Sequence, residues 1–257
     1  MSNTINWGKI HGLSYSPETN LTGTAAAPSF SNTLSTRFDG VDDYVDCGSI
    51  SAIPSSNTLS ISFWANTNSI TQNQVVWGDN SSTPIFSFEY WGSANRMYFE
   101  YGTGKYAFLT LTSVVSASNW NHIGLVYNGL GSSNTDKIKI YVDGVDKSSI
   151  ITYVGTIPSS LSSSIGDFWI GNGQKYNVPF NGAIDEVAIF SSELSASDVT
   201  AIYGSGVPSD LSTYSSLVSW WRMGDSDTFP TLTDNKGSND GTMTNMTSGN
   251  IVTDVPT

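Results

Sequence analysis

The sequence predicts an all-β domain made of two facing antiparallel sheets. Only 12% of the 257 residues are charged, whereas glycine and small polar residues are abundant, as expected for short strands joined by polar turns. Short segments with alternating apolar and polar residues recur along the chain, separated by turn-forming sequences. Aromatic residues are dense between positions 74 and 112, where large side chains would fill the space between two sheets.

The most informative predicted strand spans residues 181–190, Asn-Gly-Ala-Ile-Asp-Glu-Val-Ala-Ile-Phe. Simple alternation places one set of side chains on a common face: Ala183, Asp185, Val187 and Ile189. A carboxylate within so apolar a strand is costly unless a cation or several hydrogen-bond donors compensate its charge. A short helix should follow, with Ser195 as its N-cap and Gly204 at its end.

Three regions are predicted along the chain. Residues 1–30 are polar and weakly patterned, with Trp7 as the one large side chain, and are interpreted as an N-terminal arm. Residues 31–205 hold the predicted sandwich, and residues 206–257 form a C-terminal extension of different composition.

The first predicted strands lie at residues 38–47 and 59–65. In the second of them, alternation directs four side chains to the core: Leu59, Ile61, Phe63 and Ala65. Trp64 then lies on the opposite face among small polar residues. It is either a platform on which a sugar ring stacks or a tryptophan covered by a loop or by the partner sheet.

Further strands are predicted at residues 74–78, 84–91, 96–101 and 106–112. Tyr90 and Trp91 fall at the end of one of these strands, where exposure is plausible, and they are the other candidate stacking residues. Two more strands, at residues 120–127 and 137–144, and a return strand at 168–171 precede the strand at 181–190.

The C-terminal extension contains one strong strand pattern, at residues 217–225. Either the extension returns to add a strand to the same sandwich, or it begins a truncated second unit that docks on another chain. We favour the first interpretation because Trp220 and Trp221 need burial.

Two motifs resemble those of a known family. The stretch Arg-Phe-Asp-Gly-Val-Asp-Asp-Tyr-Val at residues 37–45 is similar to the opening motif of laminin-G-like, concanavalin A-like jelly-roll domains. Residues 181–203 resemble the closing strand and helix of the same family. The resemblance covers residues 30–205 and implies a two-sheet antiparallel jelly-roll sandwich with one short helix.

The same resemblance implies a structural calcium ion near the edge of the sandwich. Transferred to this sequence, its ligands would be the carboxylates of Asp39 and Asp185, together with main-chain oxygen near Gly40. The alternative is that both aspartates accept hydrogen bonds within turns.

Several functional classes are disfavoured by composition. A net charge of −12 with only 10 Lys and Arg residues argues against nucleic-acid binding. No apolar run approaches the length of a membrane span, so no membrane insertion is expected. The sequence contains no nucleophile–base motif and no series of paired acids along one strand, so we expect no enzymatic activity.

The stretch Trp-Trp-Arg-Met-Gly-Asp at residues 220–225 resembles the tail of similar single-domain proteins of marine phages. This resemblance implies a structural or adhesive component of a virion surface, such as a capsid decoration, fibre or tail appendage. Its partners would be other virion proteins, surface polysaccharide or both, and a homo-oligomer is consistent with this role. The alternative is a freestanding carbohydrate-binding lectin module, and a weaker alternative is a glycoside hydrolase. Residues 1–15 lack the pattern of a secretory signal, so the expected location is a virion surface or the extracellular space, reached without a signal peptide.

Overall fold

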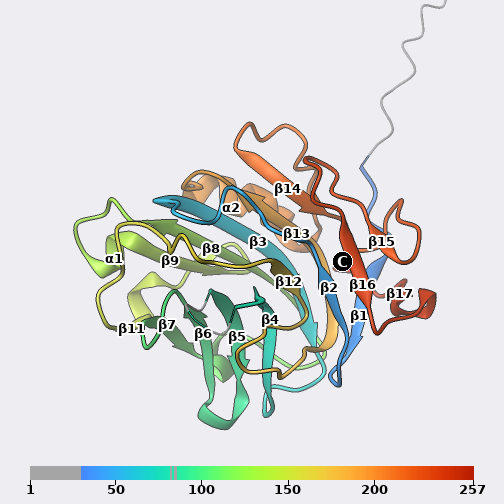
Figure 1. Cartoon of the computed structure of the whole chain (residues 1–257), viewed down its shortest axis with the longest axis horizontal. Coiled ribbons are helices and arrows are strands. Elements are labelled where there is room, and N and C mark those ends of the chain that lie inside the picture. The colour runs from blue at the N-terminus through green and yellow to red at the C-terminus, as the bar shows by residue number, and fades with distance from the viewer. Residues whose placement is uncertain (1–29, 82, 84–85) are drawn as a thin grey trace, which may run out of the picture. The chain divides into compact units, whose positions relative to one another are not determined.

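Two antiparallel sheets face each other in the computed structural model, which describes residues 30–81, 83 and 86–257 (Figure 1). The predicted arm at residues 1–30, including Trp7, lies outside the described residues except for its last position. Residues 31–257 form one compact unit, and the description below concerns that unit. None of its helices is both long enough and apolar enough to cross a membrane.

The eight-stranded sheet has the order β10-β9-β8-β3-β13-β1-β17, and β14 also pairs with β13. Its strands are β10 (Val145–Asp146), β9 (Ile138–Val142), β8 (Trp120–Asn128), β3 (Thr58–Thr67), β13 (Asn181–Phe190), β1 (Ser35–Asp39), β17 (Ile251–Val252) and β14 (Leu217–Trp221).

The nine-stranded sheet has the order β11-β7-β6-β5-β4-β12-β2-β16-β15. Its strands are β11 (Thr152–Val154), β7 (Tyr106–Thr110), β6 (Arg96–Glu100), β5 (Ser87–Trp91), β4 (Asn73–Asp79), β12 (Phe168–Ile170), β2 (Tyr44–Asp46), β16 (Gly241–Thr244) and β15 (Thr231–Leu232). Among the described residues, α-helix is confined to the single turn α1 (Asn134–Lys137) and to α2 (Ala196–Tyr203). The predicted all-β, two-sheet sandwich with one short helix is confirmed.

The core lies between the two sheets. The four side chains predicted to point inward from β3 are all buried there: Leu59, Ile61, Phe63 and Ala65. The Phe63 ring meets Phe88 of the opposite sheet edge-on, with 5.2 Å between centroids, and Trp77 lies 6.5 Å from the Phe63 ring. Aromatic residues of β4 and β5 therefore fill the inter-sheet space, as their density in the sequence predicts.

The predicted strand at residues 38–47 is two strands in two different sheets. Strand β1 ends at Asp39 and β2 begins at Tyr44. Gly40 adopts a φ of 78°, and a Cβ at this position would lie 2.7 Å from the Cβ of Asn181. Only glycine fits there without displacing Asn181, so this turn carries the chain from one sheet to the other.

Strand β13 departs from simple alternation at a β-bulge. Its register with β3 shifts between Asp185 and Ala188, and Glu186 has a φ of 49°. The inserted residue changes which side chains face the core, so Ile184 shares the core with Val187 and Ile189. The predicted common face of Ala183, Asp185, Val187 and Ile189 is therefore wrong beyond Asp185.

Helix α2 begins and ends at the predicted residues. The Ser195 hydroxyl accepts a hydrogen bond from the Asp198 N–H, and Gly204 caps the C-terminus in the left-handed conformation. The helix packs on the eight-stranded sheet, where Gly124 of β8 allows Val199 to approach (Figure 1).

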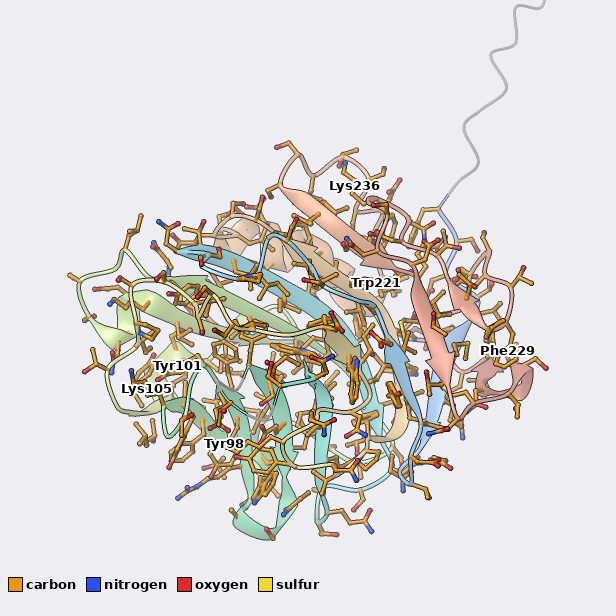
Figure 2. The ribbon with its side chains drawn as sticks, in the orientation of Figure 1. Tyr98, Tyr101, Lys105, Trp221, Phe229 and Lys236 are labelled. Atoms are coloured by element: carbon orange, nitrogen blue, oxygen red, sulfur yellow. The ribbon has the colours of Figure 1, made fainter. Side chains whose placement is uncertain are left out.

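Residues 206–257 contribute strands to both sheets of the same chain. Strand β14 pairs with the second half of β13, while β1 pairs with its first half. Strands β16 and β17 pair with β2 and β1. Trp221 is fully buried, and its indole N–H donates to the Asn239 carbonyl at 2.8 Å (Figure 2).

Truncation of Trp221 tests how much of the fold depends on the extension. We expect Trp221→Ala to lower the free energy of unfolding by about 3–5 kcal/mol, because it removes a buried indole from the core. Val207→Ala, at a residue 53% exposed, should change it by no more than about 0.5 kcal/mol. Urea unfolding at two protein concentrations provides the measurement. A midpoint that shifts with concentration would indicate that the extension packs on another chain.

Candidate functional site

Trp64 lies beneath helix α2. It is 3% exposed, and its ring stacks on Tyr203 of α2 with 5.6 Å between centroids. His122 of the neighbouring strand packs against the same indole at 5.1 Å. The structure therefore contradicts the prediction that Trp64 contacts a sugar, because the helix that follows β13 covers this face of β3.

Tyr90 lies in the core and does not reach the surface. It is fully buried, and its ring lies 6.3 Å from Phe88 and 6.2 Å from Phe180. The proposed stacking role of Tyr90 is therefore wrong as well. Strand β5 continues to Trp91, and alternation turns Tyr90 inward and Trp91 outward.

Trp91 lines a pocket of about 290 Å³ on the outer face of the nine-stranded sheet. We call this the aromatic pocket, and its lining residues are Glu89, Trp91, Tyr98, Glu100, Gly104, Tyr106, Lys175 and Tyr176. The volume is near the lower end of the range for small-molecule sites, roughly 300–1,000 Å³.

Alternation along three neighbouring strands builds the floor of the aromatic pocket. Glu89 and Trp91 point outward from β5, Tyr98 and Glu100 from β6, and Tyr106 from β7. The residues between them face the core. Figure 2 labels Tyr98 on β6, and Tyr101 and Lys105 on the turn that connects β6 with β7.

A loop that precedes β13 forms one wall of the pocket through Lys175 and Tyr176. The Lys175 ammonium donates to both carboxylate oxygens of Glu100, at 3.1 and 3.4 Å, and the Tyr176 hydroxyl donates to the same carboxylate at 2.9 Å. The rings of Trp91 and Tyr176 meet edge-on with 4.8 Å between centroids. Glu100 therefore anchors the loop to the sheet.

Glu89 is a buried acid at the floor of the pocket. Glu89 is 3% exposed, and its carboxylate accepts a hydrogen bond from the Ser87 hydroxyl at 2.5 Å. Burial raises the pKa of Glu89 to about 7, and the charge of Glu100 adds to the increase, whereas Ser87 and Lys175 oppose it. Near neutral pH this carboxyl group therefore exchanges between a hydrogen-bond donor and an acceptor.

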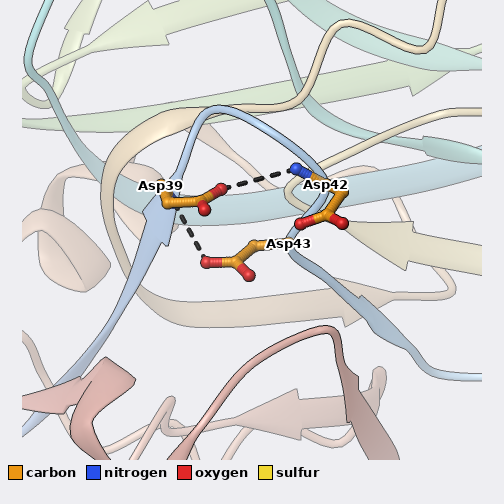
Figure 3. A group of neighbouring side chains, drawn as sticks. All are labelled: Asp39, Asp42 and Asp43. Atoms are coloured by element: carbon orange, nitrogen blue, oxygen red, sulfur yellow. Dashed lines mark hydrogen bonds between the residues drawn. The ribbon is translucent and has the colours of Figure 1, made fainter.

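A second group of acids lies on the turn between β1 and β2. Asp39, Asp42 and Asp43 each offer a carboxylate oxygen, and these oxygens lie within 4.8 Å of one another (Figure 3). Asp43 accepts hydrogen bonds from the Asp39 N–H and the Asn250 amide, both at 3.0 Å. Burial raises the pKa of Asp43. An all-oxygen set of this kind fits the ligand preference of calcium.

Asp185 lies too far from this turn to share a cation with Asp39. Asp39 pairs with Asn181 in the β1–β13 register, and Asp185 lies four residues further along β13. At about 3.3 Å per residue, this separates the two positions by roughly 13 Å. The Asp185 carboxylate instead accepts from the Asn32 amide at 2.8 Å and from the Glu186 N–H at 2.9 Å. The prediction that Asp39, Gly40 and Asp185 hold one calcium ion together is therefore wrong.

Most residues of the aromatic pocket were not identified as site residues from the sequence. Glu89 lies two positions before Trp91 on the same strand face, so alternation from Trp91 would have found it. Tyr98, Glu100 and Tyr106 require the pairing of β5, β6 and β7, which alternation alone does not provide. Lys175 and Tyr176 come from a loop, where no periodic pattern identifies a site residue.

Comparison with known proteins identifies related folds. The family model for the concanavalin A-like lectin/glucanases superfamily matches residues 39–200. No curated protein matches the sequence.

Many solved structures are similar to this chain, among them the following three. One is a predicted carbohydrate-binding protein from Bacteroides ovatus, with TM-score 0.62 and 17% identity over 88% of this chain and 62% of that protein. Another is domain 4 of AbnA, an extracellular arabinanase from Geobacillus stearothermophilus in complex with arabinotriose, with TM-score 0.50 and 19% identity over 66% of this chain and 76% of that one. The third is the extracellular region of zebrafish Gpr126/Adgrg6, with TM-score 0.55 and 13% identity over 87% of this chain and 26% of that protein. At these identities the likeness concerns the fold.

The pKa of Glu89 predicts a pH-dependent stability. Its ordinary value of 4.5 applies to the unfolded chain, whereas the folded protein holds the proton up to a pKa of about 7. The stabilisation from this proton is full below pH 4.5 and is lost as pH rises through 7. We expect the unfolding free energy of the wild type to fall relative to Glu89→Gln by up to about 3 kcal/mol between pH 5 and 8, measured by urea unfolding. Parallel pH profiles of the two proteins would contradict this assignment.

Proposed function

This chain belongs to the concanavalin A-like lectin/glucanases superfamily, and on that premise we propose that it is a non-catalytic module that binds carbohydrate in the aromatic pocket. The observation that carries the proposal is the composition of this pocket. Four aromatic rings line this pocket together with two carboxylates and one ammonium group: those of Trp91, Tyr98, Tyr106 and Tyr176. Aromatic rings pack on the apolar face of a sugar, while the charged groups hydrogen-bond its hydroxyls.

The similar structures support the same function. The Bacteroides ovatus protein is a predicted carbohydrate-binding protein, and the AbnA domain was solved in complex with arabinotriose. Of the two functions predicted from the sequence, these similar structures favour a carbohydrate-binding lectin module over a virion component. Extracellular polysaccharide is the partner that this proposal implies, and the role at a phage virion surface and the homo-oligomeric state stay predictions.

The charges of the pocket favour a neutral sugar. Its lining includes two carboxylates, Glu89 and Glu100, and one lysine, Lys175. The chain as a whole carries a net charge of −12. A sialic or uronic acid would bring its carboxylate into a negative potential, whereas neutral hydroxyls can both donate to and accept from these groups.

The same contacts argue against bond cleavage. Glycoside hydrolysis requires one carboxyl group that protonates the leaving oxygen and a second that attacks or activates water. Glu100 is engaged by Lys175 and Tyr176, and Glu89 is buried against Ser87. We therefore propose that these acids hold the loop and the floor of the pocket in place.

Replacement of Trp91 tests the proposed function. Trp91→Ala removes a ring from the pocket and should weaken binding to neutral glycans on an array by at least about 10-fold, which corresponds to roughly 1.4 kcal/mol. Trp120→Ala is the matched control, since Trp120 is half-buried and belongs to the eight-stranded sheet. The proposal fails if the two variants bind equally well, or if the wild type releases free sugar from the glycan it binds.

Calcium, implied by the family resemblance, is a separate proposal. If calcium binds, the turn with Asp39, Asp42 and Asp43 is where its oxygen donors lie together, so calcium should raise the melting temperature of the wild type. Asp42→Asn should remove most of that rise, because it neutralises one exposed carboxylate of the group. Asp185→Asn should retain the rise, whatever its effect on basal stability. Thermal melts with calcium and with chelator provide the measurement, and an unchanged wild-type melting temperature would exclude the site.

A further inference from the structure

A second hollow, of about 540 Å³, is lined by the start of β4, the segment after β5, the loop before β13 and the turn between β1 and β2. We call it the amide hollow, because uncharged polar side chains line most of it: Thr71, Gln72, Asn73, Ser93, Asn177 and Asn181. Its lining contains no charged residue and no aromatic ring. Gly40 and Val41, on the turn that carries the aspartate group, form part of its wall.

The two hollows share their supporting segments. Trp91 lines the aromatic pocket, and Ser93, two residues later, lines the amide hollow. Tyr176 lines the aromatic pocket, and the next residue, Asn177, lines the amide hollow. The contact between the Trp91 and Tyr176 rings therefore joins the two segments that contribute residues to both hollows.

Contacts of the backbone after β5 hold the segments that separate the two hollows. The Gly92 N–H donates to the Gln72 carbonyl at 3.0 Å, and a Cβ at Gly92 would lie 2.2 Å from the Thr71 carbonyl carbon. The Ser93 N–H donates to the Asn73 side-chain oxygen at 3.0 Å. These contacts hold the segment after β5 close to the start of β4. Residues that line the two hollows are therefore held at a fixed distance from each other.

We propose that the aromatic pocket and the amide hollow are two subsites of one oligosaccharide site, a proposal that rests on the proposed function. One sugar unit stacks against Trp91 and Tyr176, and the next unit reaches the amide hollow. Each amide side chain offers both donor and acceptor atoms, as sugar hydroxyls do. Without an aromatic ring, the amide hollow binds weakly by itself and adds affinity once the first unit is anchored.

The chemical class of ligand follows from the two linings together. It is a neutral oligosaccharide of at least two units, because a single ring fills the aromatic pocket and leaves the amide hollow to water. The Asn181 side-chain oxygen accepts from the Asn68 amide at 2.7 Å, which orients the Asn181 amide before any ligand arrives. A preoriented amide lowers the entropic cost of binding.

The test measures binding as a function of oligosaccharide length. Calorimetry would use the monosaccharide, disaccharide and trisaccharide of the arabinan, cellulose, xylan and mannan series. We expect the affinity of the wild type for the series it binds to rise at least about 10-fold from monosaccharide to trisaccharide, a gain of roughly 1.4 kcal/mol. Equal affinity for all three lengths would overturn the two-subsite proposal while leaving the proposed function intact. No binding to any member of the four series would overturn both.

Variants in the amide hollow separate the subsites. Gln72→Ala removes an exposed side chain, and Asn177→Gly removes a side chain at a position with a φ of 44°, which glycine tolerates. Their combination should lower trisaccharide affinity to the monosaccharide value and leave monosaccharide affinity unchanged, whereas Trp91→Ala should lower both. Asn119→Ala, at an exposed asparagine outside both hollows, is the matched control. Full trisaccharide affinity in the double variant would contradict the proposal.

Discussion

The buried ion pair between Arg222 and Glu186 connects the segments on which the sandwich depends. The Arg222 guanidinium donates to Glu186 at the bulge of β13 and to Asp225 in the C-terminal extension, both at 3.2 Å. Asp225 in turn accepts from the Thr33 N–H at 2.9 Å, next to the first strand. Burial raises the pKa of Glu186, and the charge of Arg222 opposes that increase. Removal of one partner from such a pair leaves an uncompensated buried charge, so the segment before β1, the bulge of β13 and the C-terminal extension are coupled.

The bulge also explains how β13 pairs with two different strands along one of its edges. Its first half pairs with β1 and its second half with β14, and the register with β3 shifts between these halves. Glu186 adopts a left-handed conformation there, which is costly for a residue with a side chain. The hydrogen bonds from Trp220 and Arg222 to its carboxylate hold it in place.

The nine-stranded sheet has an inner face that packs in the core and an outer face that carries the aromatic pocket. The same strands, β5 to β7, direct Phe88, Phe99 and Leu109 into the core and direct Trp91, Tyr98 and Tyr106 outward. The tightly packed inner face holds the strands in register, and the register determines the spacing of the outer rings. A binding site on such a sheet is rigid before the ligand arrives, apart from the loop with Lys175 and Tyr176, which Glu100 anchors. Rigid aromatic walls lower the entropic cost of binding.

The sequence by itself determined the layers of this protein, because alternation, turn residues and a capped helix are local properties. The inward residues of β3 and the limits of α2 follow from that level. It also indicated Tyr90 and Trp91 together as residues near a strand end, but only the structure shows that Tyr90 is buried while Trp91 lines the aromatic pocket. Only the tertiary structure decided that Trp64 lies under α2. It also decided that Asp39 pairs with Asn181, four residues before Asp185 on β13. The aromatic pocket likewise combines residues from three strands and one loop, and which of them meet depends on strand pairing across many residues of chain. Such pairing is set by the packing of the whole sandwich, whereas periodicity reports only the face on which each side chain lies.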